Sequence, residues 1–85
     1  LRDLKLGSKG LDVQSLQKFL NSLGYIVAQK GAGSKGFEST YFGPATRAAL
    51  VRFQIANKIK PAVGFFGPIT RAYVNKLIEK AVTGK

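Results

Sequence analysis

One short phrase occurs twice in this chain, and it constrains the fold more than any other feature. Tyr41–Ala48 reads aromatic-Phe-Gly-Pro-x-Thr-Arg-Ala, and Phe65–Ala72 repeats the pattern. Repetition in so short a chain indicates one supersecondary unit used twice. Glycine permits a close backbone approach, proline suits the first helical position, and alanine favours a helix. Each copy is therefore expected to begin a helix, with an aromatic pair just outside it and an arginine just inside.

The residues before the first copy predict a helix over residues 12–23, followed by a long loop. Asp12 is the expected N-cap, and Gly24 stands where a glycine commonly ends a helix. The apolar face of this helix is expected to hold Val13, Leu16, Leu20 and Leu23. Residues 28–40 are rich in glycine, serine and lysine without apolar periodicity, which predicts a mobile surface loop. Residues 31–36 fit a GxGxxG pattern, but no strand precedes them, so we interpret them as part of this loop.

Each copy of the phrase predicts the start of a further helix. One helix is expected from Pro44 to about Asn57, with an apolar face of Thr46, Ala49, Leu50 and Phe53. The other begins at Pro68, and its stripe consists of Thr70, Tyr73, Val74, Leu77, Ile78 and Ala81. No segment alternates with period two for long enough to demand a strand. The predicted fold is all-α: a small closed three-helix bundle with long connecting loops. We expect a single monomeric domain over residues 1–85, with its core in residues 4–81.

The aromatic pair in each copy is expected to divide between the core and the surface. Phe42 and Phe66, which touch the glycine, should turn inward and close the core. Tyr41 and Phe65 are then the candidate platforms for stacking on a sugar or a base.

Four polar residues fall on or beside the expected apolar faces. We interpret Gln17 and Gln54 as buried amides that bind backbone groups of a neighbouring loop, in preference to ligand contacts. Thr46 and Thr70 are interpreted from their positions as packing or helix-start residues.

The charge balance is strongly basic. The chain has 14 Lys and Arg against 4 Asp and Glu, a formal net charge of +10. Such a balance favours an anionic partner: nucleic acid, anionic lipid, or an acidic polymer such as cell wall. The alternative is a soluble surface that happens to be basic. Because no run of five or more basic residues occurs, nuclear targeting and polybasic membrane anchoring are disfavoured.

The residues of most catalytic and metal sites are absent or scattered. The chain has no Cys and no His, which excludes disulfides and the usual zinc sites. Its carboxylates are expected in different places, so no catalytic pair assembles from Asp3, Asp12, Glu38 and Glu79. We therefore expect no enzyme activity, no metal and no cofactor. No apolar run approaches the length of a membrane span. Since the chain starts at Leu1 and contains no Met, we expect it to be a piece of a longer protein.

The two copies both place an arginine at a helix start. Arg47 and Arg71 are slightly disfavoured there by the helix dipole, yet both copies have one. Free N–H groups together with an arginine make a good carboxylate or phosphate site. The alternative is a solvated side chain, or a salt bridge to Asp12 or Glu38.

Over about residues 4–78, the chain resembles the peptidoglycan-binding domain-like family. The resemblance rests on Asp12-Val13-x-x-Leu16-Gln17-x-x-Leu20-x-x-x-Gly24-Tyr25, on Phe42-Gly43-x-x-Thr46-x-x-Ala49-Leu50-x-x-Phe53-Gln54, and on Gly64-x-Phe66-Gly67-x-x-Thr70. Each motif alone is modest, whereas three in order at the right spacing are specific. The chain departs from the family in its long 28–40 loop and in residues 61–64, where an Asp usually precedes the glycine.

The resemblance implies a three-helix module that has no chemistry of its own and anchors or targets a partner domain to murein, the peptidoglycan of bacterial cell walls. It also implies an extracytoplasmic place, in the cell wall or secreted, and a covalently linked catalytic or surface domain. The ligand surface of the family is a shallow groove near the starts of the second and third helices. Carried over to this sequence, the groove implies ligand contacts by Tyr41, Thr46, Arg47, Phe65, Thr70 and Arg71.

A basic helical nucleic-acid-binding domain is the alternative function. A helix-turn-helix reader needs a short turn before a recognition helix rich in Arg, Asn or Gln. Here the expected connector has about ten residues, and the third helix offers only Arg71, Asn75 and Lys76.

Overall fold

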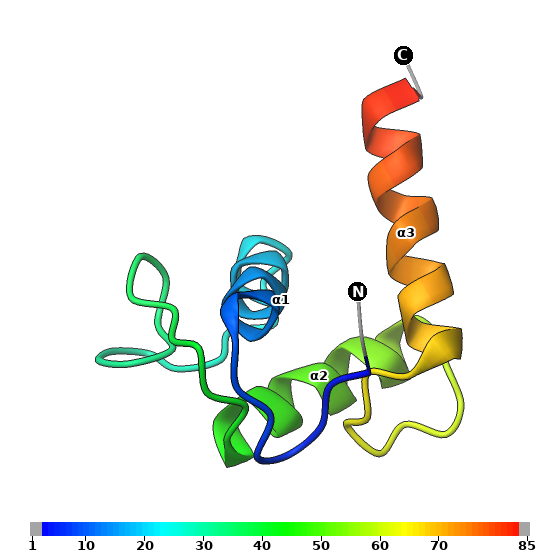
Figure 1. Cartoon of the computed structure of the whole chain (residues 1–85). Coiled ribbons are helices and arrows are strands. Elements are labelled where there is room, and N and C mark those ends of the chain that lie inside the picture. Colours follow the sequence, from blue (N-terminus) through cyan, green and yellow to red (C-terminus); the bar gives the residue numbers. More distant parts are fainter. Residues whose placement is uncertain (1–2, 84–85) are drawn as a thin grey trace.

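The computed structural model describes residues 3–83, and the side chains of residues 3–78. Over these residues the chain forms three helices, α1 (Leu11–Ser22), α2 (Pro44–Ala56) and α3 (Pro68–Thr83), and no strand. The all-α prediction is confirmed. In Figure 1, α2 crosses beneath α1, α3 rises from the far end of α2, and the loop after α1 projects on the α1 side.

The helix starts at Pro44 and Pro68 were predicted correctly, but the start of α1 was not. Its N-cap is Gly10 instead of Asp12. Gly10 has φ 144°, a backbone conformation that favours glycine, and its amide donates to the carbonyl of Thr40 at 2.9 Å. This pairing fixes where the chain turns into the helix, so α1 begins one residue early. Asp12 lies in the first turn, where its carboxylate accepts the Val13 amide at 3.0 Å.

The N-terminal segment ties the two copies together. Leu4 exchanges both backbone hydrogen bonds with Phe66, at 3.0 and 2.8 Å. Farther along, the Gly7 amide donates to the Phe42 carbonyl and the Phe42 amide donates to the Ser8 carbonyl, at 2.8 and 2.9 Å. Leu4 and Ser8 are four residues apart, so their Cα atoms are separated by at most about 14 Å. The two helix starts are therefore held near one another by a single short segment.

The core lies where the three helices and the N-terminal segment meet. Phe53 of α2 is completely buried, and it makes edge-on ring contacts with Phe19 and Tyr25 (both 5.6 Å between centroids) and with Tyr73 (6.0 Å). The buried apolar residues are Leu4, Val13, Leu16, Leu20, Val27, Phe42, Ala49, Leu50, Phe53, Ile59, Phe66 and Val74. This set confirms the inward placement of Phe42 and Phe66.

Two residues expected on apolar faces are largely exposed. Leu23 is 48% exposed because α1 ends at Ser22 and the chain turns away at Gly24, whose φ is 93°. Ile78 is also 48% exposed, since it lies on the part of α3 that rises away from α2 (Figure 1). Ala81, expected on the same stripe, lies outside the described side chains.

A buried amide holds the 28–40 loop against α1. The Asn21 amide nitrogen donates to the Gly33 carbonyl and to a Glu38 carboxylate oxygen, both at 3.0 Å, and its oxygen accepts the Val27 amide at 2.8 Å. These bonds tie Gly33 and Glu38 to α1, whereas the side chain of Phe37 is 71% exposed. The mobility of this loop stays a prediction.

Candidate functional site

The two copies of the phrase have the same local construction. Each outer aromatic ring lies over the glycine two residues later. A Cβ added to Gly43 would lie 2.9 Å from Cε2 of Tyr41, and one added to Gly67 would lie still closer to Cε2 of Phe65. Tyr41 and Phe65 stay 48% and 39% exposed. The glycines are therefore needed for close approach of a ring, and the rings are braced platforms at the surface.

A glutamine from the preceding helix clamps each copy from inside. Gln17 of α1 donates its amide to the Tyr41 carbonyl at 3.0 Å and to the Thr46 hydroxyl at 2.9 Å. Its oxygen accepts the backbone amide of Ser39 at 2.6 Å. The nitrogen and the oxygen of this buried side-chain amide thus both have hydrogen-bond partners.

The second clamp repeats the first with residues of α2 and α3. Gln54 donates its amide to the Phe65 carbonyl and to the Thr70 hydroxyl, both at 3.0 Å, and its oxygen accepts the Gly64 amide at 2.9 Å. The interpretation of both glutamines as buried amides that bind backbone is confirmed. The clamps fix the carbonyl of each aromatic residue and hence the place of its ring.

Thr46 and Thr70 are interior residues. They are 2% and 3% exposed, and each hydroxyl accepts a glutamine amide. Their positions agree with the interpretation as packing residues. The outward-facing members of the expected ligand set are therefore Tyr41, Phe65 and the two arginines.

Arg47 reaches from the first turn of α2 toward the second copy. Its Nε donates to the Val63 carbonyl at 3.3 Å, and its aliphatic stem packs so tightly on Gly64 that a Cβ there would collide with it. Gly64 also has φ 77°, so both its backbone conformation and the lack of space for a Cβ favour glycine at this position. Arg47 thus lies beside the residue preceding Phe65 and connects the two copies.

Arg71 has a different partner. Its guanidinium nitrogen Nη2 lies 2.9 Å from the Asp3 carboxylate, with the two side chains 29% and 47% exposed. The sequence left open a salt bridge to Asp12 or Glu38; the carboxylate found beside Arg71 is that of Asp3. Glu38 instead accepts hydrogen bonds from Asn21 and from the Gly36 amide, and these lower its pKa below the ordinary value.

A shallow apolar depression adjoins the second copy. It has a volume of about 230 Å³ and lies between the connector after α2 and the first turn of α3. Its lining is Ile59, Lys60, Pro61, Phe65, Gly67, Pro68, Ile69 and Thr70. The Phe65 platform therefore forms one edge of a hollow that can accept a small apolar group.

Neither a metal-binding cluster nor a membrane-spanning helix occurs in the described part of the chain. Among the described side chains, residues 3–78, no three His, Cys, Asp or Glu residues gather closely enough to hold a metal ion. Within residues 3–83, no helix has the length and apolar content needed to cross a membrane.

A family model described as "Putative peptidoglycan binding domain" matches residues 9–72. This match spans three quarters of the chain and includes both copies of the phrase, both clamping glutamines and the connector. The chain belongs to the peptidoglycan-binding domain family. Peptidoglycan binding, and with it cell-wall association, is the property of this family. No curated protein and no solved structure gives a significant match.

Three residues have structural roles that were not predicted from the sequence. Asn21 holds the 28–40 loop, and Asp3 pairs with Arg71. Lys58, two residues after the end of α2, has a positive φ of 57°. Only Lys58 had a local signal, because a helix commonly ends in this conformation and no glycine follows Asn57. The other two roles depend on contacts between distant parts of the chain.

Proposed function

We propose that this peptidoglycan-binding domain is a non-catalytic module that anchors a covalently linked partner domain to murein outside the cytoplasm. One observation carries the proposal. An exposed aromatic ring, braced on a glycine and followed six residues later by an arginine, occurs twice near one short segment. Two modest contacts on one chain suit a repeating polymer better than a single small ligand, because simultaneous contacts add to avidity.

The expected binding mode follows from the chemistry of these side chains. A sugar ring can rest on Tyr41 or Phe65, whose outer faces are partly exposed. Stem-peptide carboxylates are natural partners for Arg47 and Arg71, which lie where helix N–H groups already favour an anion. Thr46 and Thr70 support the binding surface from inside, by holding the clamps that position each ring.

The non-catalytic part of the proposal is supported by the residue types that the sequence lacks. The chain has neither Cys nor His, so a nucleophile would lack its common bases. The family itself is described by binding and not by a reaction.

The nucleic-acid alternative receives less support. In a helix-turn-helix, the two helices are joined by a turn of roughly 3–4 residues. Residues 57–67 separate α2 from α3, and this connector is itself packed against Arg47 and Gln54. Sheared DNA is nevertheless the right competitor in the binding experiment, since a net charge of +10 attracts any polyanion.

Co-sedimentation with insoluble murein tests the proposal. Wild type is compared with Arg47→Ala, Arg71→Ala and the double variant. Each single variant is expected to bind roughly two- to fivefold more weakly, because partly exposed ion pairs contribute about 0.2–1 kcal/mol. Binding should also weaken with added salt.

Arg52→Ala is the matched control, because this substitution removes one positive charge from α2, as Arg47→Ala does. Its guanidinium donates to the carbonyl of Ile26, in the segment after α1, at 2.6 Å. Circular dichroism verifies that each variant is folded. The proposal fails if the folded double variant sediments like wild type, or if sheared DNA displaces the protein from murein completely at physiological salt.

A further inference from the structure

A second hollow adjoins the apolar depression beside Phe65. It has a volume of about 330 Å³ and shares Ile59, Lys60 and Ile69 with its neighbour. We call the two together the junction groove, because they lie where α2 passes into α3. The second hollow is lined by Asn57, Lys58, Ile59, Lys60, Ile69, Ala72, Tyr73 and Lys76.

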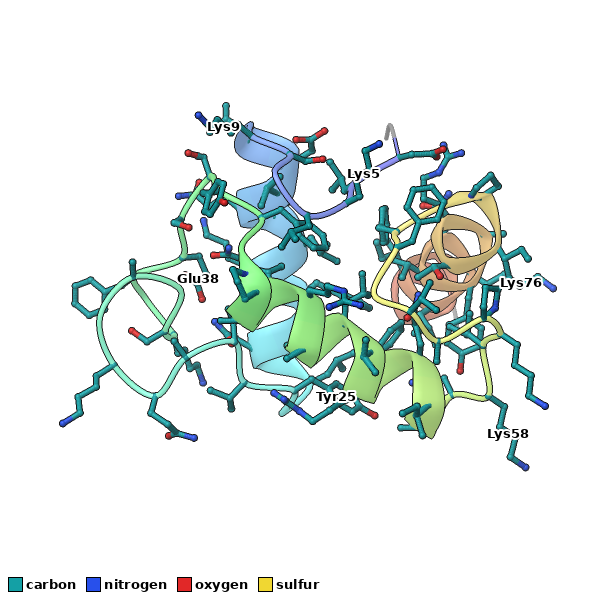
Figure 2. All side chains as sticks on the ribbon, turned by 90° about the horizontal axis from the view of Figure 1, so that it is seen from below. Lys5, Lys9, Tyr25, Glu38, Lys58 and Lys76 are labelled. Atoms are coloured by element: carbon teal, nitrogen blue, oxygen red, sulfur yellow. The ribbon has the colours of Figure 1, made fainter. Side chains whose placement is uncertain are left out.

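The junction groove combines an apolar floor with three cations. Ile59 is buried, whereas Ile69 is 63% exposed, and Pro61 and Pro68 complete the apolar part. Lys58, Lys60 and Lys76 are exposed at the second hollow. Figure 2 shows Lys58 and Lys76 on the same side of the molecule, with Glu38 on the opposite side.

The charge of the groove is not balanced by nearby carboxylates among the described side chains, residues 3–78. Asp3 pairs with Arg71, Asp12 lies in the first turn of α1, and Glu38 is held by Asn21. None of these three lines either hollow. Among the described side chains, the groove thus combines positive charge with apolar surface.

The walls of the groove are fixed by internal hydrogen bonds. The Tyr73 hydroxyl donates to the Asn57 side-chain oxygen at 2.6 Å, and the Asn57 amide donates to the Phe53 carbonyl at 2.8 Å. The Ile59 amide closes the end of α2 on the Gln54 carbonyl at 2.8 Å. A preformed groove binds a partner with a smaller ordering cost than a mobile one.

We propose that the junction groove docks an acidic peptide segment of a partner protein, with an apolar side chain in the hollow beside Phe65 and carboxylates on Lys58, Lys60 and Lys76. Charge complementarity and the apolar floor together favour this occupant. A phosphodiester polymer would satisfy the lysines but leave the apolar hollow without a matching group. A lipid surface needs apolar side chains that protrude, whereas this surface is concave. The interaction goes beyond murein binding, because it uses cations that the aromatic platforms do not.

Fluorescence anisotropy tests the proposal with a short fluorescein-labelled peptide in which glutamates flank leucines. The test variant combines Lys58→Asn, Lys60→Gln and Lys76→Gln, where asparagine is chosen because it tolerates the positive φ of Lys58. The control combines Lys18→Gln, Lys30→Gln and Lys35→Gln, three exposed lysines outside the groove that carry the same charge. A matched peptide with serines in place of leucines tests the apolar hollow.

The groove variant is expected to bind the leucine peptide about tenfold more weakly than wild type, and the control variant within about twofold. The serine peptide should bind wild type several-fold more weakly than the leucine peptide. Equal losses in the two variants would reduce the effect to net charge and overturn the proposal. Equal binding of the two peptides would overturn it too, as would binding of inorganic polyphosphate with no binding of the leucine peptide.

Murein co-sedimentation of the same variants separates this proposal from the anchoring function. If the groove and control variants sediment equally with murein, the three lysines of the groove are not part of the murein surface. If the groove variant alone loses murein, the lysines belong to that surface and the peptide-docking proposal is wrong.

Discussion

The two copies of the repeated phrase are alike inside the protein and different at its surface. Inside, each copy has one buried phenylalanine, one threonine hydroxyl and one glutamine clamp. Outside, Arg47 lies along the connector and bonds the Val63 carbonyl, whereas Arg71 faces the Asp3 carboxylate. The shared part is therefore what begins and holds a helix, and the surface arginines are free to differ.

The difference predicts unequal roles in anion binding. Arg71 must exchange an internal carboxylate for an external one, so its gain on binding is reduced. Arg47 exchanges a bond to a neutral carbonyl, and among the described side chains it faces no carboxylate at hydrogen-bond distance. The first copy is expected to contribute more to binding than the second.

The largest effect is expected where both copies depend on one residue. Phe53 is buried among rings from α1, α3 and the turn after α1. Phe53→Ala should lower the free energy of unfolding by about 3–5 kcal/mol, through lost burial and the cavity left behind. Leu16→Ala should cost about 2–5 kcal/mol for the same reason. Urea denaturation measures both, and an unchanged midpoint in either variant would contradict the core assignment.

The next largest loss of stability is expected when either clamping glutamine is replaced, and the two losses test whether the copies are equivalent. Gln17→Met and Gln54→Met keep the side-chain length but leave buried backbone groups without their partner. Each should cost about 2–3 kcal/mol, and the two costs should agree to within about 1 kcal/mol. Gln29→Met, at an exposed position, is the control. A large cost in one copy alone would break the comparison.

The braced rings predict a smaller effect that a double-mutant cycle can isolate. Gly43→Ala should cost about 1–3 kcal/mol, because the new Cβ meets the Tyr41 ring. In the Tyr41→Ala background the same substitution should be nearly neutral, since the ring is gone. Gly67→Ala with and without Phe65→Ala repeats the cycle in the second copy. Equal costs with and without the ring would show that the glycine serves the backbone instead.

Much of this construction could be predicted from local sequence. Pro44 and Pro68 fix a helical φ at the first position, so both helix starts were predicted correctly. Phe42 and Phe66 were predicted to turn inward from their position next to the glycine, and the glutamines were predicted to be buried from their place beside apolar stripes. These features depend on periodicity and on neighbouring residues, which a single sequence displays directly.

The remaining features depend on contacts between distant segments. The start of α1 is fixed by Gly10 pairing with Thr40, and the environment of Arg71 by Asp3, 68 residues earlier in the chain. The exposure of Leu23 and Ile78 depends on where a helix ends and how far its neighbours reach. Local spacing contains none of this information, so Asp12 was wrongly expected as the N-cap.

Acid is expected to loosen the loop before the first copy. Hydrogen bonds from Asn21 and Gly36 lower the pKa of Glu38, so its ionised form is favoured in the folded protein. This stabilisation is complete above the ordinary pKa of a glutamate and is lost as pH falls through the lowered value. The protection of amides in residues 28–40, expressed relative to their intrinsic exchange rates at each pH, should therefore decrease in acid. In Glu38→Gln the loop should exchange at the same relative rate across this pH range, and an acid response that persists there would assign it to another group.

The smallest expected effect decides whether Asp3 masks the second arginine. Asp3→Asn removes the carboxylate that faces Arg71, at a stability cost below about 1 kcal/mol because the pair is partly exposed. Murein binding should rise a few-fold, since Arg71 no longer exchanges one carboxylate for another. Glu38→Gln makes the same change in net charge elsewhere and should raise binding less. In the Arg71→Ala background, Asp3→Asn should add no more than Glu38→Gln does. If Asp3→Asn raises binding equally with and without Arg71, the gain is net charge alone, and the surface difference between the copies has no bearing on binding.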